Sequence, residues 1–341
     1  MRLLVIRASA MGDVALVTPV LKEMRKNYPE TEIVMLTRSS FKSFFSQDDH
    51  LTVYSPDFKG RHKSLAGIFK LYRDIKRQYR IDHVIDIHDV LRSKILRLLF
   101  RLGGTPVSVI DKGRKDKRDL ISGKRKMQLK HSVVRYCETF NRAGLHLEPS
   151  DKQSIASKIE EIKLSEVFNI KHDLNIGIAP YALHKLKMWP EENMICLMKM
   201  ISEKYNTGYF LFGGKEDALQ LEAIKEKVPG AVNLAGNLSL GEELAIMSRL
   251  DFMIAMDSSN MHMASLAGTK VISIWGGTDP FNGFGAWMQP DEYSIRIPVT
   301  ELTCRPCTIF GKGKCKRGDF ACMNWLTPEM VFQKIKETGL I

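Results

Sequence analysis

The segment LLVIRASAMGD, residues 3–13, decides the fold of the first half of this chain. Its leading apolar residues predict a buried strand, and the small and polar residues after them predict a tight turn that enters a helix. The segment FMIAMDSSNMHMA, residues 252–264, repeats this pattern in the second half. In an open α/β sheet such a turn lies at the carboxyl end of a strand, where ligands bind. The two segments therefore predict an α/β protein with two Rossmann-like domains, whose parallel sheets face each other across a cleft.

Size and net charge limit the choice of partners. The chain has 341 residues, which favours two domains, and Lys plus Arg exceed Asp plus Glu by 51 − 39 = +12. This balance favours anionic partners, namely nucleic acid, phosphorylated substrates or an anionic membrane surface. A basic soluble protein with none of these partners would have the same composition.

The sequence has no segment typical of membrane insertion or secretion. No stretch reaches the 18 apolar residues of a transmembrane helix. The apolar run between Arg2 and Arg7 is too short for a signal peptide. We therefore expect a cytoplasmic protein, in which cysteines are normally reduced.

Strand and helix patterns alternate along both halves, which is typical of parallel sheets built from βαβ units. The first half has expected strands at 3–6, 33–36, 84–87 and 107–110, and expected helices from Thr18-Pro19 to Asn27, around 65–75, at 91–102 and at 131–144. The second half has expected strands at 174–179, 209–212, 232–234, 252–255 and 271–275, and expected helices at 191–205, 216–227, 241–249 and 260–267.

The polar and charged stretch at 145–172 marks the predicted domain boundary. We expect an N-terminal domain over 1–165 and a C-terminal domain over 172–326. We expect the last helix, at 327–341, to pack back on the N-terminal domain.

The segment 112–130 is rich in Lys and Arg and poor in apolar residues, which predicts a mobile loop. It is either a solvated loop or a site for anionic sugar acids or lipid phosphates. No aromatic residues interleave with its charges, so it lacks the stacking platform of single-stranded nucleic-acid sites. We therefore expect no nucleic-acid partner.

Asp13 follows the first strand and Gly12, and two roles fit this position. An Asp at a helix start can cap backbone amides and favour the helix dipole. The same carboxylate, at the carboxyl edge of the sheet, can act as a general base on an acceptor hydroxyl. The sequence does not decide between these roles. It disfavours a hydride-transfer enzyme, because the first turn lacks the G-x-G-x-x-G fingerprint of dinucleotide sites.

Polar residues also follow several strands of the second half. Lys187 lies just before a predicted helix and suits a phosphate, although taken alone it is more simply an exposed loop lysine. Glu216 follows Gly213-Gly214 and either accepts a ribose hydroxyl or caps a helix. The cluster 257–262 either offers amide donors to an anion at a helix N-terminus, or is a Ser and Asn cap beside a packed histidine.

Four of the six cysteines gather near the C-terminus, at Cys304, Cys307, Cys315 and Cys322. The first pair has the C-x2-C spacing of a zinc half-site, but the second pair is spaced more widely than usual. Structural zinc and reduced thiols both fit this pattern. We expect thiols without a metal.

Several motifs together resemble the ADP-heptose:lipopolysaccharide heptosyltransferases of glycosyltransferase family 9. They appear in family order and cover nearly the whole chain, which makes the combination specific. The motifs are RASAMGD at 7–13, KMWP at 187–190, LAGNLSLGEEL at 234–244, DSSNMHMA at 257–264, and the C-x-P-C…C-M…T-P-E pattern at 304–329.

The resemblance implies a GT-B fold, an acceptor in the N-terminal domain, a nucleotide-sugar in the C-terminal domain, and an inverting transfer that requires neither metal nor cofactor. It implies that Asp13 is the general base. The donor contacts that it implies are Lys187, Glu216, Asp257, Ser258, Ser259 and His262. For the acceptor we expect contacts from Ser9, Gly12, Arg61 and Lys63.

Two positions depart from the family pattern. Ser259 stands where the family usually has Gly, and Ala182-Leu183 stands where it often has hydroxyl residues. The details of donor binding, including the sugar, depend on these positions.

We therefore expect a glycosyltransferase that moves heptose, or a related sugar, from an ADP-sugar to the anionic lipopolysaccharide inner core. We also expect peripheral contact with the anionic inner face of the cytoplasmic membrane. Two alternatives stay open: a nucleotide-sugar transferase of the same fold that builds capsule or another glycan, and a non-catalytic protein that binds a nucleotide or polyanion. The joint presence of Asp13, Lys187 and Asp257 disfavours the second, because such a protein needs none of them.

Overall fold

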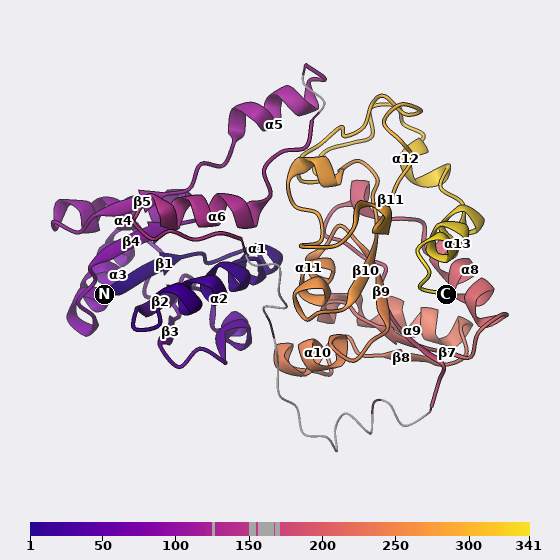
Figure 1. The fold of residues 1–341 in the computed structure, drawn as a ribbon, viewed down its shortest axis with the longest axis horizontal. Coiled ribbons are helices and arrows are strands. Elements are labelled where there is room, and N and C mark those ends of the chain that lie inside the picture. The colour runs from indigo at the N-terminus through magenta and orange to yellow at the C-terminus, as the bar shows by residue number, and fades with distance from the viewer. Residues whose placement is uncertain (125–126, 150–154, 156–166, 168–170) are drawn as a thin grey trace. The chain divides into compact units, whose positions relative to one another are not determined.

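The computed structural model describes residues 1–124, 127–149, 155, 167 and 171–341. The chain forms two compact units (Figure 1). Unit 1 consists of Met1–Lys112 with Ser132–Ile155, and unit 2 consists of Gly113–His131 with Ala156–Ile341. The boundary region expected at 145–172 lies largely outside the described residues.

Unit 1 is built on a five-stranded parallel sheet with the order β3-β2-β1-β4-β5. Its described strands are β1 (Arg2–Ile6), β2 (Glu32–Leu36), β3 (Leu51–Tyr54), β4 (His83–Asp86) and β5 (Val107–Val109). Its described helices are α1 (Met11–Ala15), α2 (Thr18–Asn27), α3 (Leu65–Gln78), α4 (Leu91–Leu102), α6 (Ser132–Asn141) and the 3₁₀ helix η1 (Ser39–Phe45).

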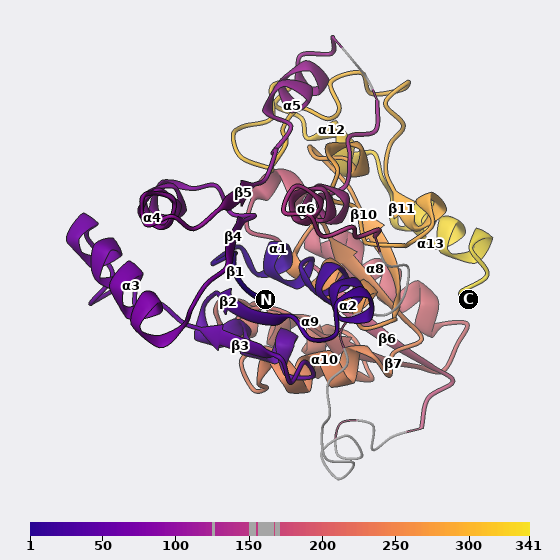
Figure 2. The same ribbon diagram turned by 60° about the vertical axis from the view of Figure 1, so that its left-hand side comes forward.

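Helices cover both faces of this sheet. Figure 2 shows α3 and α4 on one face and α2 and α6 on the other. On α3, the buried residues Ile68, Leu71 and Ile75 recur at helical spacing and pack with Leu96 and Phe100 of α4 against the strands. The apolar periodicity of these segments therefore places their inner faces on the sheet, as the sequence predicts.

Unit 2 is built on a six-stranded parallel sheet with the order β11-β10-β9-β6-β7-β8. Its described strands are β6 (Leu174–Ala179), β7 (Thr207–Leu211), β8 (Ala231–Asn233), β9 (Phe252–Met256), β10 (Lys270–Ile274) and β11 (Ser294–Ile295). Its described helices are α5 (Arg114–Ile121), α8 (Glu191–Ser202), α9 (Ala218–Lys227), α10 (Leu240–Met247), α11 (Ser259–Leu266), α12 (Ala321–Asn324) and α13 (Pro328–Glu337). Short 3₁₀ helices are η2 (Lys185–Lys187), η3 (Lys215–Asp217), η4 (Pro280–Asn282) and η5 (Asp291–Tyr293).

The C-terminal helix α13 belongs to unit 2, which differs from the expectation that it packs on the N-terminal domain. It packs against α8. Val331, Phe332 and Ile335 are buried in the same cluster as Met194 and Met198 of α8. The sequence shows the apolar stripe of this helix but not the surface that receives it.

The basic segment 112–130 also differs from expectation. It contains helix α5 and lies largely in unit 2, although we expected a mobile loop within the N-terminal domain. The backbone N–H of Leu129 donates to Phe281 O at 2.9 Å, and Lys117 Nζ lies 5.3 Å and 5.4 Å from the ring centroids of Phe284 and Phe310. These contacts anchor the segment. Arg125 and Lys126 lie outside the described residues.

In each sheet, the strand order reverses beside the first strand of the unit. In unit 1 this point lies between β1 and β4, and in unit 2 it lies between β6 and β9. Loops leave such a point in opposite directions, and ligands bind there in open α/β sheets.

None of the helices that the structure describes has the length and apolar character of a membrane-spanning helix.

Candidate active site

Asp13 lies in the first turn of α1, just beyond the carboxyl end of β1. Its carboxylate forms an ion pair with the Arg7 guanidinium. It also accepts a 3.4 Å hydrogen bond from the backbone N–H of Ala10, so some capping occurs. A guanidinium partner favours the ionised carboxylate, which is the form that a general base needs.

Arg7 is buried and holds this turn in place. Its Nη1 donates to Ile87 O at 2.7 Å, and its guanidinium carbon lies 5.8 Å from the ring centroid of Tyr136. Burial lowers the pKa of Arg7, but nearby Tyr136 and Asp13 outweigh this effect and leave the pKa raised. Arg7 therefore stays charged and fixes the Asp13 side chain.

The loop after β4 brings a histidine to the same edge. His88 Nε2 lies 3.4 Å from Ser9 Oγ. Burial, followed by the nearby charges of Arg7 and Lys112, lowers the pKa of His88 to about 4, although the charge of Asp13 opposes the shift. His88 is therefore neutral near pH 7. The buried Asp86 braces the loop, because it accepts from the His88 N–H at 2.9 Å and pairs with Arg97 at 2.8 Å.

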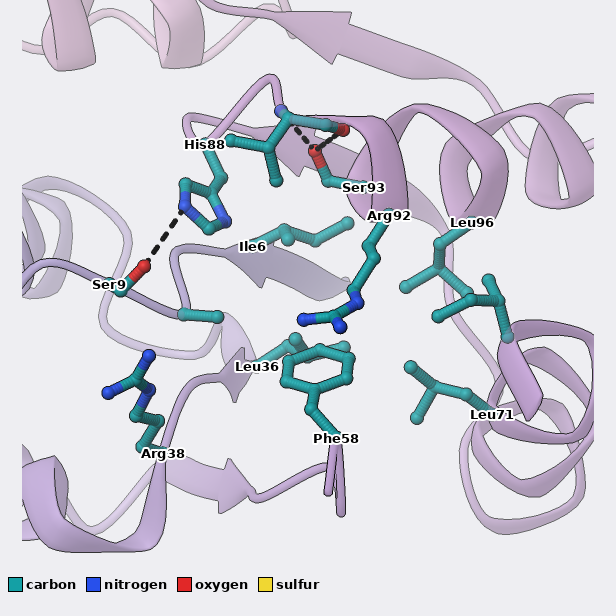
Figure 3. A pocket seen from close by; sticks show the side chains of 13 residues that line it. Ile6, Ser9, Leu36, Arg38, Phe58, Leu71, His88, Arg92, Ser93 and Leu96 are labelled. Carbon is teal, nitrogen blue, oxygen red and sulfur yellow. Dashed lines mark hydrogen bonds between the residues drawn. The ribbon is translucent and has the colours of Figure 1, made fainter. Parts of the chain in front are cut away.

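A pocket opens beside these residues, as Figure 3 shows. It has a volume of about 460 Å³, including the space at its open mouth. Its lining is Ile6, Ala8, Ser9, Leu36, Arg38, Phe58, Ile68, Leu71, His88, Val90, Arg92, Ser93 and Leu96. The apolar part of this lining includes Leu36, Leu71 and Leu96. The guanidinium carbon of Arg92 lies 5.0 Å from the ring centroid of Phe58.

The charges of the pocket indicate the kind of ligand that it can hold. The lining includes two guanidinium groups, on Arg38 and Arg92, and no carboxylate. A guanidinium binds a carboxylate or phosphate through paired hydrogen bonds. The pocket therefore suits an anionic molecule with an apolar surface.

Of the expected acceptor residues, only Ser9 lines this pocket. Gly12 is buried within α1, and Lys63 is exposed in the loop before α3. Arg61 donates to the Asp74 carboxylate at 2.9 Å and 3.0 Å. Their acceptor roles stay predictions.

Four polar residues of the pocket, Arg38, His88, Arg92 and Ser93, were not predicted as site residues from the sequence. Arg38 follows β2, while His88 and Arg92 follow β4. The sequence does contain this signal, because polar residues directly after buried strands lie at the ligand edge of a parallel sheet.

In unit 2, two of the residues expected to bind the donor, Lys187 and Asp257, meet at the switch point. Lys187 follows β6 and Asp257 follows β9, and Lys187 Nζ lies 2.8 Å from Asp257 Oδ2. Thr278, which follows β10, donates from Oγ1 to the same oxygen at 2.8 Å. Gly311 backs Lys187, because a Cβ at this residue, whose φ is +81°, would lie 2.7 Å from the lysine side chain. These contacts fix the ammonium group, which has three N–H donors and can bind a second anion.

The N-terminus of α11 lies directly after Asp257. Ser258 is its N-cap residue, and Ser258 Oγ is buried with no hydrogen-bond partner among the described residues. The first amides of a helix have no partner within the helix and attract anions. Ser259 begins the helix, and His262 is buried one turn further along.

Glu216 is exposed on η3, after β7. The capping role that the sequence allowed for it is filled by its neighbour, because Asp217 Oδ2 accepts from Gly214 N–H at 2.8 Å. Glu216 follows β7 and Lys187 follows β6, and these two strands are neighbours in the sheet. Its contact with a donor nucleoside stays a prediction.

The four C-terminal cysteines are free thiols. Burial raises the pKa of Cys322 to about 11 and also raises the pKa of Cys307. Within the described parts of the chain, no three His, Cys, Asp or Glu side chains are placed to hold a metal ion. The expectation of thiols without a metal stays a prediction.

Two parallel-sheet α/β units, each with ionisable side chains at its switch point, place the chain in the structural class of the GT-B fold. The chain belongs to glycosyltransferase family 9, whose model, described as glycosyltransferase family 9 (heptosyltransferase), matches residues 68–307. It is therefore a glycosyltransferase, and the family resemblance inferred from the sequence is confirmed. The matched region begins after the Asp13 motif.

Similar proteins extend this match to nearly the whole chain. The lipooligosaccharide heptosyltransferase 2 of Haemophilus influenzae is 21% identical over an alignment of 358 residues, which covers 99% of each chain. The solved structure of the E. coli ADP-heptose lipopolysaccharide heptosyltransferase II is 18% identical, covers 99% of this chain and 98% of its own, and has a TM-score of 0.69. The E. coli heptosyltransferase WaaC with ADP-2-deoxy-2-fluoro heptose is 18% identical, covers 99% and 100%, and has a TM-score of 0.68. The structural likeness confirms the expected GT-B fold.

Proposed function

We propose that this chain transfers heptose, or a closely related sugar, from an ADP-sugar to the inner core of lipopolysaccharide. The family supports glycosyl transfer, and the names of the similar proteins support this donor and acceptor. The observation that carries the proposal is the fixed ammonium group of Lys187 at the switch point of unit 2, next to the buried Ser258 hydroxyl at the N-terminus of α11.

On the donor side, the diphosphate binds Lys187 and the first amides of α11. Asp257, which accepts from Thr278, holds the ammonium group, and this group donates its remaining hydrogens to the diphosphate. Negative charge grows on the diphosphate as the sugar leaves, so these donors stabilise the transition state more than the ground state. A fixed ammonium group can serve here without a metal ion.

On the acceptor side, the pocket of unit 1 holds an anionic sugar of the core. Arg38 and Arg92 bind its carboxylate or phosphate, and Phe58 packs on its apolar face. Asp13 accepts the proton of the acceptor hydroxyl. Neutral His88, held beside Ser9, positions this hydroxyl without adding a competing positive charge.

The reaction is a single displacement that inverts the anomeric carbon. The acceptor oxygen forms a bond to this carbon while the carbon–diphosphate bond breaks, and ADP leaves with the electron pair. The proton of the hydroxyl passes to Asp13. Because attack and departure occur on opposite sides of the carbon, its configuration inverts.

The test is turnover of ADP-heptose with de-acylated core acceptors of increasing length, followed by mass spectrometry of the product. Lys187→Ala should weaken donor binding by about 10–100-fold, because a charged hydrogen bond contributes about 1.5–3 kcal/mol. Lys185→Ala is the matched control, since Lys185 lies on the same 3₁₀ helix but packs against Phe320. Chelation should leave the rate unchanged.

Lys187→Ala also leaves Asp257 without its cation, so Lys187→Ala/Asp257→Asn separates loss of donor binding from loss of folding. If the double variant folds normally and still binds the donor like the wild type, the donor assignment is wrong. Faster transfer from a UDP- or GDP-sugar than from ADP-heptose would contradict the proposed donor. It would favour a transferase that builds another glycan.

A further inference from the structure

We propose that the outer surface of α3 and α4 docks on an anionic lipid bilayer and presents the pocket of unit 1 to a lipid-linked acceptor. This inference rests on the proposed function, because that function supplies the lipid-linked acceptor. The two helices lie side by side on one face of the unit 1 sheet (Figure 2).

The first observation is an apolar stripe on α4. Leu91, Leu98 and Leu102 are exposed, with 73% of Leu91 and 77% of Leu102 accessible, and Ile95 is half-buried between them. Their spacing of four, three and four residues puts them on one side of the helix. On α3, Leu65 and Phe69 are exposed at a spacing of four residues.

This exposure is confined to one face of the unit. Single exposed leucines are ordinary on soluble proteins, but contiguous apolar surface marks an interaction site. Among the described residues of unit 1, the large exposed apolar side chains other than Met1 lie on α3, on α4, or at Val90, the N-cap residue of α4. Helices α2 and α6 on the other face have none.

The second observation is charge. The exposed residues of α3 and α4 include seven basic side chains and no acidic one. These basic residues are Lys70, Arg73, Lys76, Arg77, Arg92, Lys94 and Arg101. Apolar residues flanked by Lys and Arg suit the interface of an anionic membrane, where basic side chains are attracted to the lipid headgroups.

The third observation is that the same helices form walls of the pocket. Ile68 and Leu71 of α3 line it, as do Arg92, Ser93 and Leu96 of α4. Their inner sides therefore face the pocket and the core, while their outer sides carry the exposed apolar residues and the basic residues other than Arg92. A bilayer on the outer side would place a lipid-anchored sugar within reach of the pocket mouth.

The test is flotation of the full-length protein with phosphatidylcholine vesicles, with and without phosphatidylglycerol. The wild type should bind the vesicles that contain phosphatidylglycerol, and Leu98→Gln/Leu102→Gln should weaken this binding at least about tenfold. The matched control is Leu183→Gln/Leu219→Gln, which changes two leucines of unit 2 that are 91% and 86% exposed. Lys94→Gln/Arg101→Gln should weaken binding mainly at low salt.

Turnover of a de-acylated, water-soluble acceptor distinguishes this proposal from the proposed function. The Leu98→Gln/Leu102→Gln variant should turn over this acceptor like the wild type, but should lose turnover of an acceptor embedded in vesicles. Equal vesicle binding by this variant and the wild type would overturn the docking surface and leave the transferase assignment intact. If this variant instead converts a dimer into a monomer in ultracentrifugation, the face is a contact between copies and the proposal is wrong.

Discussion

Two contacts of the Asp13 carboxylate correspond to its two candidate roles. The Ala10 amide contact corresponds to capping, and the Arg7 ion pair corresponds to a carboxylate that is held charged at the sheet edge. The sequence does not distinguish these roles, because both require an acidic residue at the start of a helix. The Arg7 contact was also not predictable, since it depends on how the turn folds back on β1.

Asp13→Asn should abolish most of the transfer without unfolding the protein. Asn caps a helix as well as Asp does, so a capping role predicts almost no change. Loss of a general base predicts a decrease of at least about a hundredfold in single-turnover transfer. Transfer and thermal melting should be measured together.

The matched control is Asp48→Asn, which breaks another Asp–Arg ion pair of unit 1, with Arg25 at 2.9 Å. It should leave transfer unchanged. Near-wild-type transfer by a folded Asp13→Asn variant would assign the base to another residue.

His88 makes stability depend on pH in a definite direction. Its pKa is lowered from 6.5 to about 4 in the folded protein, chiefly by burial. The unfolded chain therefore binds a proton more readily, and His88 destabilises the fold as the pH falls from 6.5 to about 4. His88→Gln should make the melting temperature less sensitive to pH in this window, compared with the wild type.

His50→Gln is a suitable control, because His50 is an exposed histidine of the same unit. Half-buried His131, whose pKa is also lowered to about 4, chiefly by desolvation, should contribute a separate part of the same acid sensitivity. An unchanged pH slope in His88→Gln would show that His88 is protonated in the folded state.

Among the elements, the loops after β10 and β11 depend on one buried arginine, Arg305. Its guanidinium donates to Gly276 O at 2.6 Å, Thr278 O at 3.0 Å and Trp275 O at 3.2 Å, and it also donates to Ile297 O. It lies 3.4 Å from the buried Asp279 carboxylate. Arg305 therefore holds the turn that carries Thr278, which in turn holds Asp257.

Arg305→Met should reduce the unfolding free energy by about 3–5 kcal/mol, because it leaves the buried Asp279 carboxylate with Arg296 alone and removes the donor to four backbone carbonyls. Denaturant unfolding measures this change. Arg317→Met is the control, since Arg317 pairs with Asp319 near the same loops but its side chain is 44% exposed. An equal effect of the two substitutions would contradict the bracing role of Arg305.

The sequence predicts the central elements of both sheets well, because buried strands and amphipathic helices have clear apolar patterns. It misses β3 and β11 for physical reasons. β3 is an edge strand of four residues with no buried side chain, and β11 has only two residues. It also misses α5, whose only buried residue is Leu120. Such elements depend on tertiary contacts rather than on their own pattern.

In the whole molecule, the chain order of the segments does not match their grouping into units. Residues 113–131 leave unit 1 after β5, pack with unit 2, and return to unit 1 at α6. The sequence gives no sign of this exchange, because the segment is basic and its anchors lie far along the chain, at Phe281 and Phe284. Basic residues expected beside the acceptor therefore belong to the unit that carries Lys187.

We predict that the basic residues of α5 attract the anionic acceptor, because exposed positive charge raises the local concentration of an anionic ligand. Arg114→Gln/Lys115→Gln/Arg118→Gln neutralises three exposed charges and leaves Lys117, which packs on aromatic rings, in place. Exposed ion pairs contribute about 0.2–1 kcal/mol each, so the KM for an anionic acceptor should rise about threefold or more at low salt. Donor affinity should stay constant.

The effect should decrease as salt is added, because exposed charges are screened within about 8–10 Å at physiological ionic strength. Lys199→Gln/Lys227→Gln/Lys336→Gln is the matched control, since it removes the same charge from exposed positions on α8, α9 and α13. A rise in acceptor KM in both variants would reflect net charge alone. An acceptor KM that changes with neither substitution nor salt would leave α5 as a solvated surface helix.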